Sequence, residues 1–164
     1  MHFEIDQPIG APSDAVERTL VDSAYYAALS GMPNLGTPEV LERTESDGVV
    51  SVSVRYAFTG AMSPAVQAVL DPDKLTWVIH TSFDLAEHHA SFTMVPDHYT
   101  DLLTCSGTHL FLEAPAGTQQ IAEGELKVNF PIVGRNVERA IVGGLERHVA
   151  GEAAAIEAWV AEHP

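Results

Sequence analysis

The chain has 164 residues, of which 46% are hydrophobic, and its formal net charge is −15. A chain of this length can bury one sizeable core, so residues 1–164 are expected to form a single domain. Its eight lysines and arginines disfavour binding to nucleic acid or to anionic membrane surfaces, because both are bound through clustered positive charge.

The cysteine content and the N-terminal segment predict a cytoplasmic protein. Cys105 is the single cysteine and cannot form an internal disulfide, so no oxidising compartment is implied. Residues 2–8 alternate in polarity and lack the basic start and continuous apolar run of a secretory signal. No stretch approaches the length needed to cross a bilayer, so membrane insertion is not expected.

The N-terminal part predicts one strand followed by a pair of helices. Residues 2–8 form the strand. A helix is expected to begin at residues 12–14, where Asp14 and Glu17 have the spacing of a capping box. A second helical piece covers residues 22–29 and ends before a glycine and a proline. Such a helix pair is expected to cap one end of a sheet.

The middle of the chain predicts a hairpin and a short helical connection. Residues 50–58 alternate as in a half-buried strand, and residues 38–45 are expected to pair with them across the turn at 46–48. Ser63 and Pro64 then start a short helix that is expected to end near Asp71, since serine caps well and proline is favoured at the first helical position.

Four further strands are predicted, at residues 74–84, 88–95, 102–113 and 118–130. The last has the clearest pattern, because Glu123, Glu125 and Lys127 alternate with Leu126 and Val128. We expect the three charged side chains to face solvent, since burying them without partners is costly.

Residues 134–164 predict one long amphipathic helix. Its apolar side chains recur at spacings of mainly four residues and are Val137, Ile141, Leu145, Val149, Ile156 and Val160. The charged residues expected on its other faces are Glu138, Arg139, Glu146, Arg147 and Glu157. A series of strands closed by one long helix suggests a sheet that grips the helix and leaves a cavity for an apolar small molecule.

Several short stretches resemble a known family. They are residues 75–78 (LTWV), 105–108 (CSGT), 123–126 (EGEL) and 130–134 (FPIVG), the last followed by Val137 and Glu138. With the element order, they resemble an uncharacterised family of bacterial proteins in the START-like (SRPBCC) superfamily, to which lipid-binding domains, plant allergens and polyketide cyclases belong. The resemblance covers nearly the whole chain.

The resemblance implies an α+β helix-grip fold, with a curved antiparallel sheet of about seven strands wrapped around a long C-terminal helix and a helix pair after the first strand. It implies binding of a hydrophobic ligand, such as a lipid or polycyclic metabolite, and it supplies no catalytic residues or cofactor. The candidate ligand-contacting residues are Tyr56, Phe58, Trp77, Ile79, Phe92, His109, Leu126, Val128, Ile141, Leu145 and Val149.

Two alternatives remain open at this point. The first is a cyclase or aromatase-like enzyme that uses Tyr56 or His109 as an acid or base. The second is a protein with a filled core that acts through its surface, with a homodimer as one form. An open cavity with converging polar groups would favour the first alternative over the second.

Three features with potential chemistry have simpler interpretations. His88 and His89 are adjacent and would point to opposite faces of a strand, so no metal site is predicted for them and His98. Cys105 and His109 share a strand face but are about 13 Å apart, too far for a nucleophilic pair. The sequence pattern does not decide whether the strand face that carries Cys105 and His109 points inward. If it does, His109 is a candidate polar anchor for a ligand.

The pair Gly143 and Gly144 lies inside the predicted long helix and costs about 1 kcal/mol per glycine. Close approach of another element, or a mild kink, is the favoured explanation. Room for a ligand beneath the helix is the alternative.

Overall fold

The computed structural model describes residues 1–164. The elements in chain order are β1 (His2–Ile9), α1 (Ser13–Leu20), α2 (Ser23–Ala28), β2 (Glu39–Ser46), β3 (Val49–Ala57), α3 (Pro64–Gln67), the 3₁₀ turn η1 (Pro72–Lys74), β4 (Thr76–Asp84), β5 (His89–Pro96), β6 (Leu103–Ala114), β7 (Gly117–Val128) and α4 (Gly134–Glu162). This order confirms the predicted strand, helix pair, six strands and long helix.

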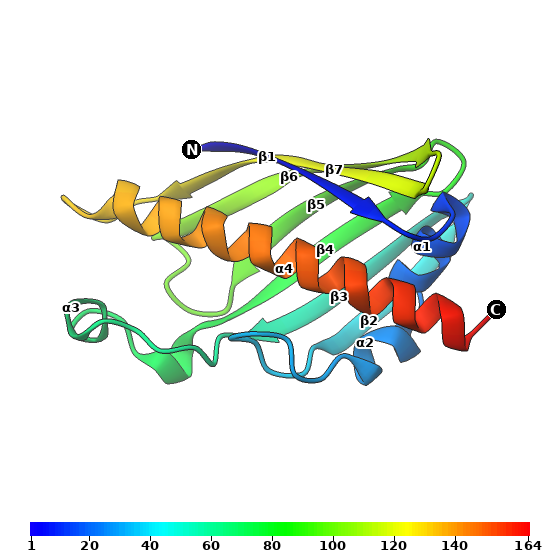
Figure 1. Ribbon diagram of the computed structural model, residues 1–164. Helices are drawn as coiled ribbons and strands as arrows, with labels where there is room; N and C mark the ends of the chain where they lie inside the picture. Colours follow the sequence, from blue (N-terminus) through cyan, green and yellow to red (C-terminus); the bar gives the residue numbers. More distant parts are fainter.

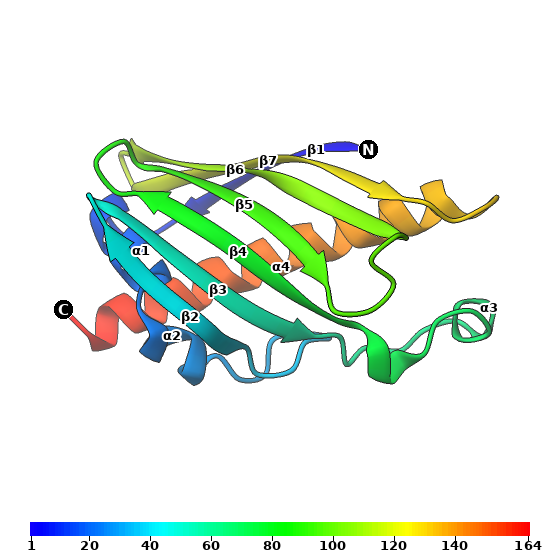
Figure 2. The same cartoon turned by 180° about the vertical axis from the view of Figure 1, so that it is seen from behind.

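The seven strands form one antiparallel sheet in the order β1-β7-β6-β5-β4-β3-β2. The sheet is curved, and α4 lies along its concave face (Figure 1). Helices α1 and α2 lie at the end of the sheet where α4 finishes, and the convex face carries no helix (Figure 2). The architecture is therefore the predicted α+β helix-grip fold.

The two N-terminal helices begin differently. Asp22 caps α2, since its carboxylate accepts a hydrogen bond of 2.9 Å from the backbone N–H of Ala24. Helix α1 starts after Pro12 without a side-chain cap, so the predicted capping box of Asp14 and Glu17 is wrong. Glu17 instead points to the β4–β5 turn and binds His88.

The β2–β3 hairpin confirms the predicted turn. Asp47 and Gly48 have φ values of 53° and 80°, the left-handed conformation that tight hairpin turns require and that glycine adopts without strain. Strand β2 is an edge strand with a bulge between Val40 and Glu42. The connection beyond β3 differs from the prediction, because α3 ends at Gln67 and β4 begins only at Thr76, after η1.

Two glycines shape the middle of the sheet. Gly107 of β6 and Gly124 of β7 are directly opposite each other. A Cβ atom on Gly107 would lie 2.1 Å from the carbonyl oxygen of Glu123, and one on Gly124 would lie 2.8 Å from Cζ of Phe3. Only residues without a side chain allow the backbones and Phe3 to approach this closely.

The register of β7 follows its sequence pattern. Glu123, Glu125 and Lys127 are exposed, as predicted, whereas Leu126 is fully buried. Glu138 of α4 differs from its predicted outward position, because it is 8% exposed and its carboxylate accepts a 2.9 Å hydrogen bond from the backbone N–H of Val128. The last amide of β7 needs an acceptor there, and Glu138 supplies it.

None of the helices combines the length and apolar character needed to span a membrane.

Candidate functional site

The concave face of the sheet and the side of α4 packed against it form what we call the inner face. Strand register places directly opposed residues on the same side, so Tyr56 and Trp77 lie together, as do Ala90 and His109. The structure therefore settles that Cys105 and His109 of β6 point inward. Ten predicted contact residues lie on the inner face: Tyr56, Trp77, Ile79, Phe92, His109, Leu126, Val128, Ile141, Leu145 and Val149.

Phe58 is the exception among the predicted contact residues. Strand β3 ends at Ala57, and Phe58 forms an isolated bridge with Leu35 in the loop after α2. Its ring lies 2.6 Å from where a Cβ atom on Gly60 would be. The structure thus places Phe58 among loop residues rather than within the sheet.

Packing is tight at one end of the inner face and open at the other. Near α1 and α2, Val50, Phe83 and Phe111 are 1%, 3% and 2% exposed. Towards the start of α4, Trp77 and Leu145 remain half-buried although they point inward. The core is therefore closed at the helix-pair end and loosens towards the N-terminus of α4.

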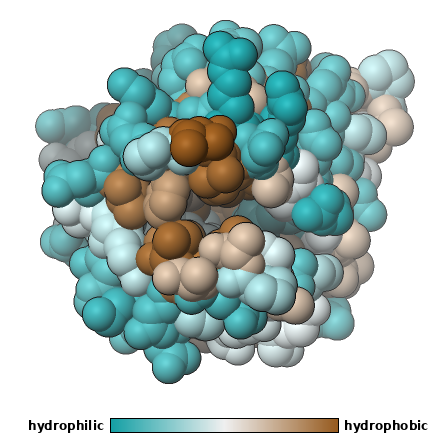
Figure 3. Space-filling view, turned by 90° about the vertical axis from the view of Figure 1, so that its left-hand side faces the viewer, coloured by the Kyte–Doolittle hydropathy of each residue, from teal (hydrophilic) through white to brown (hydrophobic).

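A hollow of about 670 Å³ lies at that open end, between the last residues of β7 and the first turns of α4. Its lining residues are Met1, Lys127, Val128, Phe130, Ile132, Gly134, Arg135, Glu138 and Arg139. Apolar side chains gather around a hollow on this end of the molecule (Figure 3). Ile132, which is fully exposed, contributes to this apolar surface without any packing role of its own.

Three aromatic side chains with polar atoms meet on the inner face. The ring of Tyr56 stacks on Trp77 at a centroid distance of 6.1 Å and contacts the edge of His148 at 6.0 Å. The Nε1 atom of Trp77 and the Nδ1 atom of His148 are buried and have no hydrogen-bond partner. An unpaired buried polar group costs about 1–3 kcal/mol, so both atoms are expected to have a partner that the protein itself does not supply.

Glu152 lies one helical turn beyond His148 on α4. Burial raises the pKa of the Glu152 carboxyl, and nearby His148 only partly offsets this. Tyr25 of α2 is 1% exposed, and its hydroxyl also has no partner. The candidate residues predicted from the sequence do not include His148, Glu152 or Tyr25. The spacing of four residues from Gly144 to His148 and from His148 to Glu152 is the signal that could have placed these two polar residues on the same side of α4 as Gly144.

His109 is held in one protonation state. The side-chain amide nitrogen of Gln120 donates to Nδ1 of His109 at 3.1 Å, so the proton of the neutral ring lies on Nε2. Burial, with His89 and His148 nearby, lowers the pKa of His109 to about 4. The ring is therefore neutral at physiological pH and packs beside Phe92 at a centroid distance of 5.0 Å.

Cys105 does not have the properties of a nucleophile. It is 3% exposed, and burial raises the pKa of its thiol to about 11. A thiol with this pKa is almost entirely protonated at neutral pH, as expected for a buried inert cysteine.

The two glycines of α4 have free space beside them. A Cβ atom on Gly143 or on Gly144 would have only the guanidinium of Arg147 within 4 Å, at 3.6 and 4.0 Å respectively. The prediction that another element closely approaches these glycines is therefore wrong. The space beside Gly144 is consistent with the alternative, room for a ligand.

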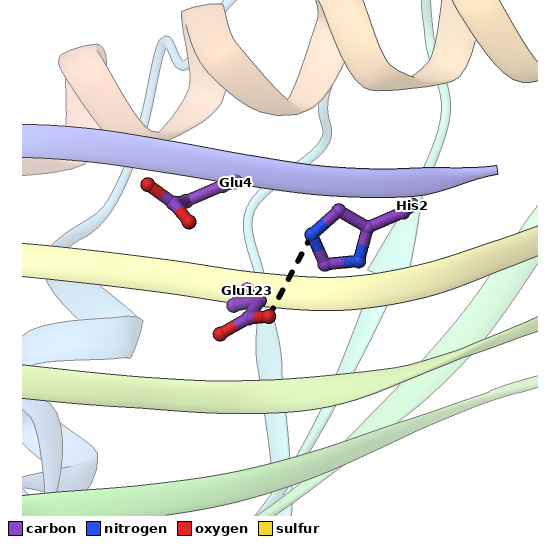
Figure 4. A group of neighbouring side chains, drawn as sticks. All are labelled: His2, Glu4 and Glu123. Atoms are coloured by element: carbon purple, nitrogen blue, oxygen red, sulfur yellow. Dashed lines mark ion pairs between the residues drawn. The ribbon is translucent and has the colours of Figure 1, made fainter.

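One histidine on the outside, His2, lies in a cluster of carboxylates. His2, Glu4 and Glu123 gather on the exposed surface of β1 and β7 (Figure 4). The Nε2 and Nδ1 atoms of His2 lie 3.6 and 3.0 Å from Glu123 and Glu125, so both ring nitrogens already have partners. Exposed ion pairs of this kind contribute little to stability and do not define a metal site.

Comparisons with known proteins agree with this architecture. The structure is similar to TTHA0849 from Thermus thermophilus, with a TM-score of 0.70, 18% identity and 99% of each chain covered. It is similar to the Zhui aromatase/cyclase from Streptomyces sp. R1128, with a TM-score of 0.66, 20% identity and coverage of 98% of this chain and 93% of that one. It is also similar to Ara h 8.0201, with a TM-score of 0.62, 14% identity and coverage of 99% and 98%.

At these identities the structural likenesses show the fold alone. A search of curated proteins found no match. The model of one sequence family, described as "Protein of unknown function (DUF2505)", matches residues 4–160. The chain therefore belongs to the DUF2505 family.

Proposed function

We propose that the protein binds a hydrophobic small molecule, a lipid or a polycyclic metabolite, between α4 and the inner face of the sheet. The ligand enters at the end where α4 begins and contacts residues on both layers. Burial of its apolar surface supplies the driving force, at about 25 cal/mol per Å². The proposed contacts are the ten inner-face residues given above, with Phe58 at the edge of the site.

The observation that carries this proposal is the loosened packing of the inner face towards the start of α4. Inward-facing side chains there, Trp77, Phe92 and Leu145 among them, are only half-buried. Apolar side chains that stay accessible between a helix and a sheet favour a binding site for an apolar molecule. The hollow beside Val128 and Phe130, at the mouth of this region, supports the same interpretation.

A polycyclic fluorescent probe tests the proposal. We expect its binding to quench or shift the emission of Trp77, measured in a Trp159→Phe background that removes the other tryptophan. Leu145→Arg should abolish binding, because a guanidinium would enter an apolar space. The neighbouring exposed residue gives the matched control Glu146→Arg, which should bind normally. Circular dichroism separates lost binding from lost folding.

Gly144→Leu separates lost binding from lost folding better than Leu145→Arg does. It adds a side chain beside the proposed ligand without an atomic clash in the protein. We expect retained folding with weaker probe binding, and Gly143→Leu is its control. Wild-type protein that binds no apolar probe would favour the alternative of a filled core that acts through its surface or as a homodimer.

A cyclase or aromatase-like activity is the second candidate function. It is favoured by the protonatable groups on the inner face, where Tyr56 lies beside His148 and a neutral His109 is available as a base. An aromatase/cyclase shares this fold, so the fold is compatible with that reaction class. Incubation with a linear poly-β-ketone mimic tests it, and turnover lost in both Tyr56→Phe and His109→Phe would support it.

A further inference from the structure

Positive charge gathers at the hollow beside the start of α4. Three of the eight lysines and arginines line it, namely Lys127, Arg135 and Arg139, whereas only one of the 23 acidic residues, Glu138, does so. The hollow is therefore locally positive in a chain whose formal net charge is −15. A cleft lined mainly by one sign of charge attracts small molecules of the opposite sign.

These three cations have no carboxylate partner in the protein. Three arginines elsewhere are paired: Arg18 with Asp14, Arg43 with Glu45 and Arg55 with Asp97. Lys127, Arg135 and Arg139 form no ion pair. The carboxylate of Glu138 already accepts a 2.9 Å hydrogen bond from the backbone N–H of Val128. Arg135 and Arg139 are four residues apart on α4, a spacing at which like charges destabilise a helix, and a bound anion would remove that repulsion.

Apolar side chains line the same hollow. Val128, Phe130 and Ile132 border it, and its volume of about 670 Å³ lies within the range of about 300–1,000 Å³ usual for small-molecule sites. Figure 3 shows apolar side chains around the hollow and hydrophilic residues next to them. Ile132 is fully exposed and has a φ of 70°, a conformation that is strained for a β-branched residue. Packing within the protein does not explain its position, whereas contact with the apolar part of a ligand does.

We propose that the ligand is an amphipathic anion with an apolar body and one carboxylate or phosphate group, and that Lys127, Arg135 and Arg139 bind the charged group in the hollow. The apolar body extends past Ile132 towards the inner face. This inference rests on the proposed binding function and narrows its ligand class. Glu152 lies about 20 Å further along α4 than Arg139, at a rise of about 1.5 Å per residue, so its carboxyl does not oppose the charged group.

Three compounds with the same ring system test the proposal: the uncharged 2-naphthamide and the anions 2-naphthoate and 2-naphthyl phosphate. Equilibrium dialysis against the full chain at neutral pH and low ionic strength gives a dissociation constant for each. We expect the anions to bind about five- to tenfold more tightly than the amide, although the net charge of the whole protein opposes anion binding. The tighter-binding anion identifies the head group. About 0.5 M NaCl should remove most of the preference, because salt screens exposed charges.

Charge variants assign the preference to its residues. Arg135→Gln and Arg139→Gln each remove one exposed cation and keep a good helix former. Each should weaken anion binding about two- to threefold and leave binding of the amide nearly unchanged, and the double variant should remove most of the preference. Arg18→Gln removes one exposed arginine from α1, at the closed end of the inner face, and is the matched control that should keep the preference. Circular dichroism checks that each variant folds.

The outcomes separate this inference from the proposed function. Equal binding of the amide and the anions, or a preference for the anions that is unchanged in the double variant, would overturn the inference and leave apolar binding intact. Sedimentation with phosphatidylglycerol vesicles tests a different partner for the same cations. Vesicle binding that needs Arg135 and Arg139, with equal affinity for the three compounds, would assign these arginines to a membrane surface and also overturn the inference. If none of the three compounds binds, both proposals are wrong.

Discussion

The imidazole Nδ1 of His88 lies 2.5 Å from Oε2 of Glu17 and ties the β4–β5 turn to helix α1. The Glu17 side chain is 3% exposed and that of His88 is 45% exposed, so the carboxylate is held inside and its partner reaches it from the surface. His88 adopts a φ of 53°, a left-handed conformation that is uncommon for residues other than glycine but in which histidine is enriched.

This pair predicts that the free energy of unfolding falls as the pH rises. The hydrogen bond and charge of Glu17 raise the pKa of His88 above 6.5, and burial raises that of Glu17 above 4.5. A raised folded-state pKa gives stability that is complete below the unfolded value and is lost as the pH rises through the folded value. Denaturant unfolding at about pH 6 and about pH 9 measures the difference.

His88→Gln should flatten this pH dependence. It should also destabilise the protein by about 1–3 kcal/mol at the lower pH, since the buried Glu17 loses its partner. His98→Gln, at an exposed position, is the control. A pH profile that is the same in His88→Gln and the wild type would contradict the assignment.

Replacing glycine by alanine should lower the stability of the protein at Gly107 in the sheet and raise it at Gly143 in α4. Gly107→Ala places a Cβ atom 2.1 Å from a backbone carbonyl oxygen that cannot move aside, so we expect a loss of about 2 kcal/mol or more. Gly143→Ala meets no clash and should gain up to about 1 kcal/mol from helix propensity. Thermal unfolding of both variants provides the measurement, and a neutral Gly107→Ala would show that the sheet can relax there.

His109 should remain neutral well into the acid range. Its folded-state pKa of about 4 is below the ordinary value of 6.5, so its contribution to stability is complete above pH 6.5 and is lost as the pH falls towards 4. NMR titration of the imidazole measures the midpoint directly. A midpoint near 6.5 in the folded protein would mean that the ring is hydrated and would weaken its proposed role as a neutral base.

The sequence predicts the fold well because its signals are local and periodic. Alternation in β7 correctly places Glu123 outside and Leu126 inside, and the four-residue spacing in α4 correctly places Val149 against the sheet. The same reasoning locates ten of the eleven candidate contacts on the inner face. Their contact with a ligand stays a prediction.

The errors arise where a tertiary contact determines the position of a residue. Phe58 continues the alternation of β3, but the strand ends at Ala57 and the chain turns to Leu35. Glu138 falls at a polar position of the helical pattern yet is buried, because its side chain accepts a hydrogen bond from the backbone N–H of Val128. His148 and Glu152 escape a search for apolar spacing since polar residues on an inner face carry no hydrophobic signal.

The bulged edge strand β2 has a consequence for association between molecules. An unpaired edge offers backbone groups to which another chain can add a strand. Here that edge is exposed and carries Glu39, Glu42 and Glu45, and its bulge interrupts the regular spacing of hydrogen bonds. A second copy approaching by its own β2 would bring its glutamates against these, so edge-to-edge pairing of two β2 strands is disfavoured by like-charge repulsion.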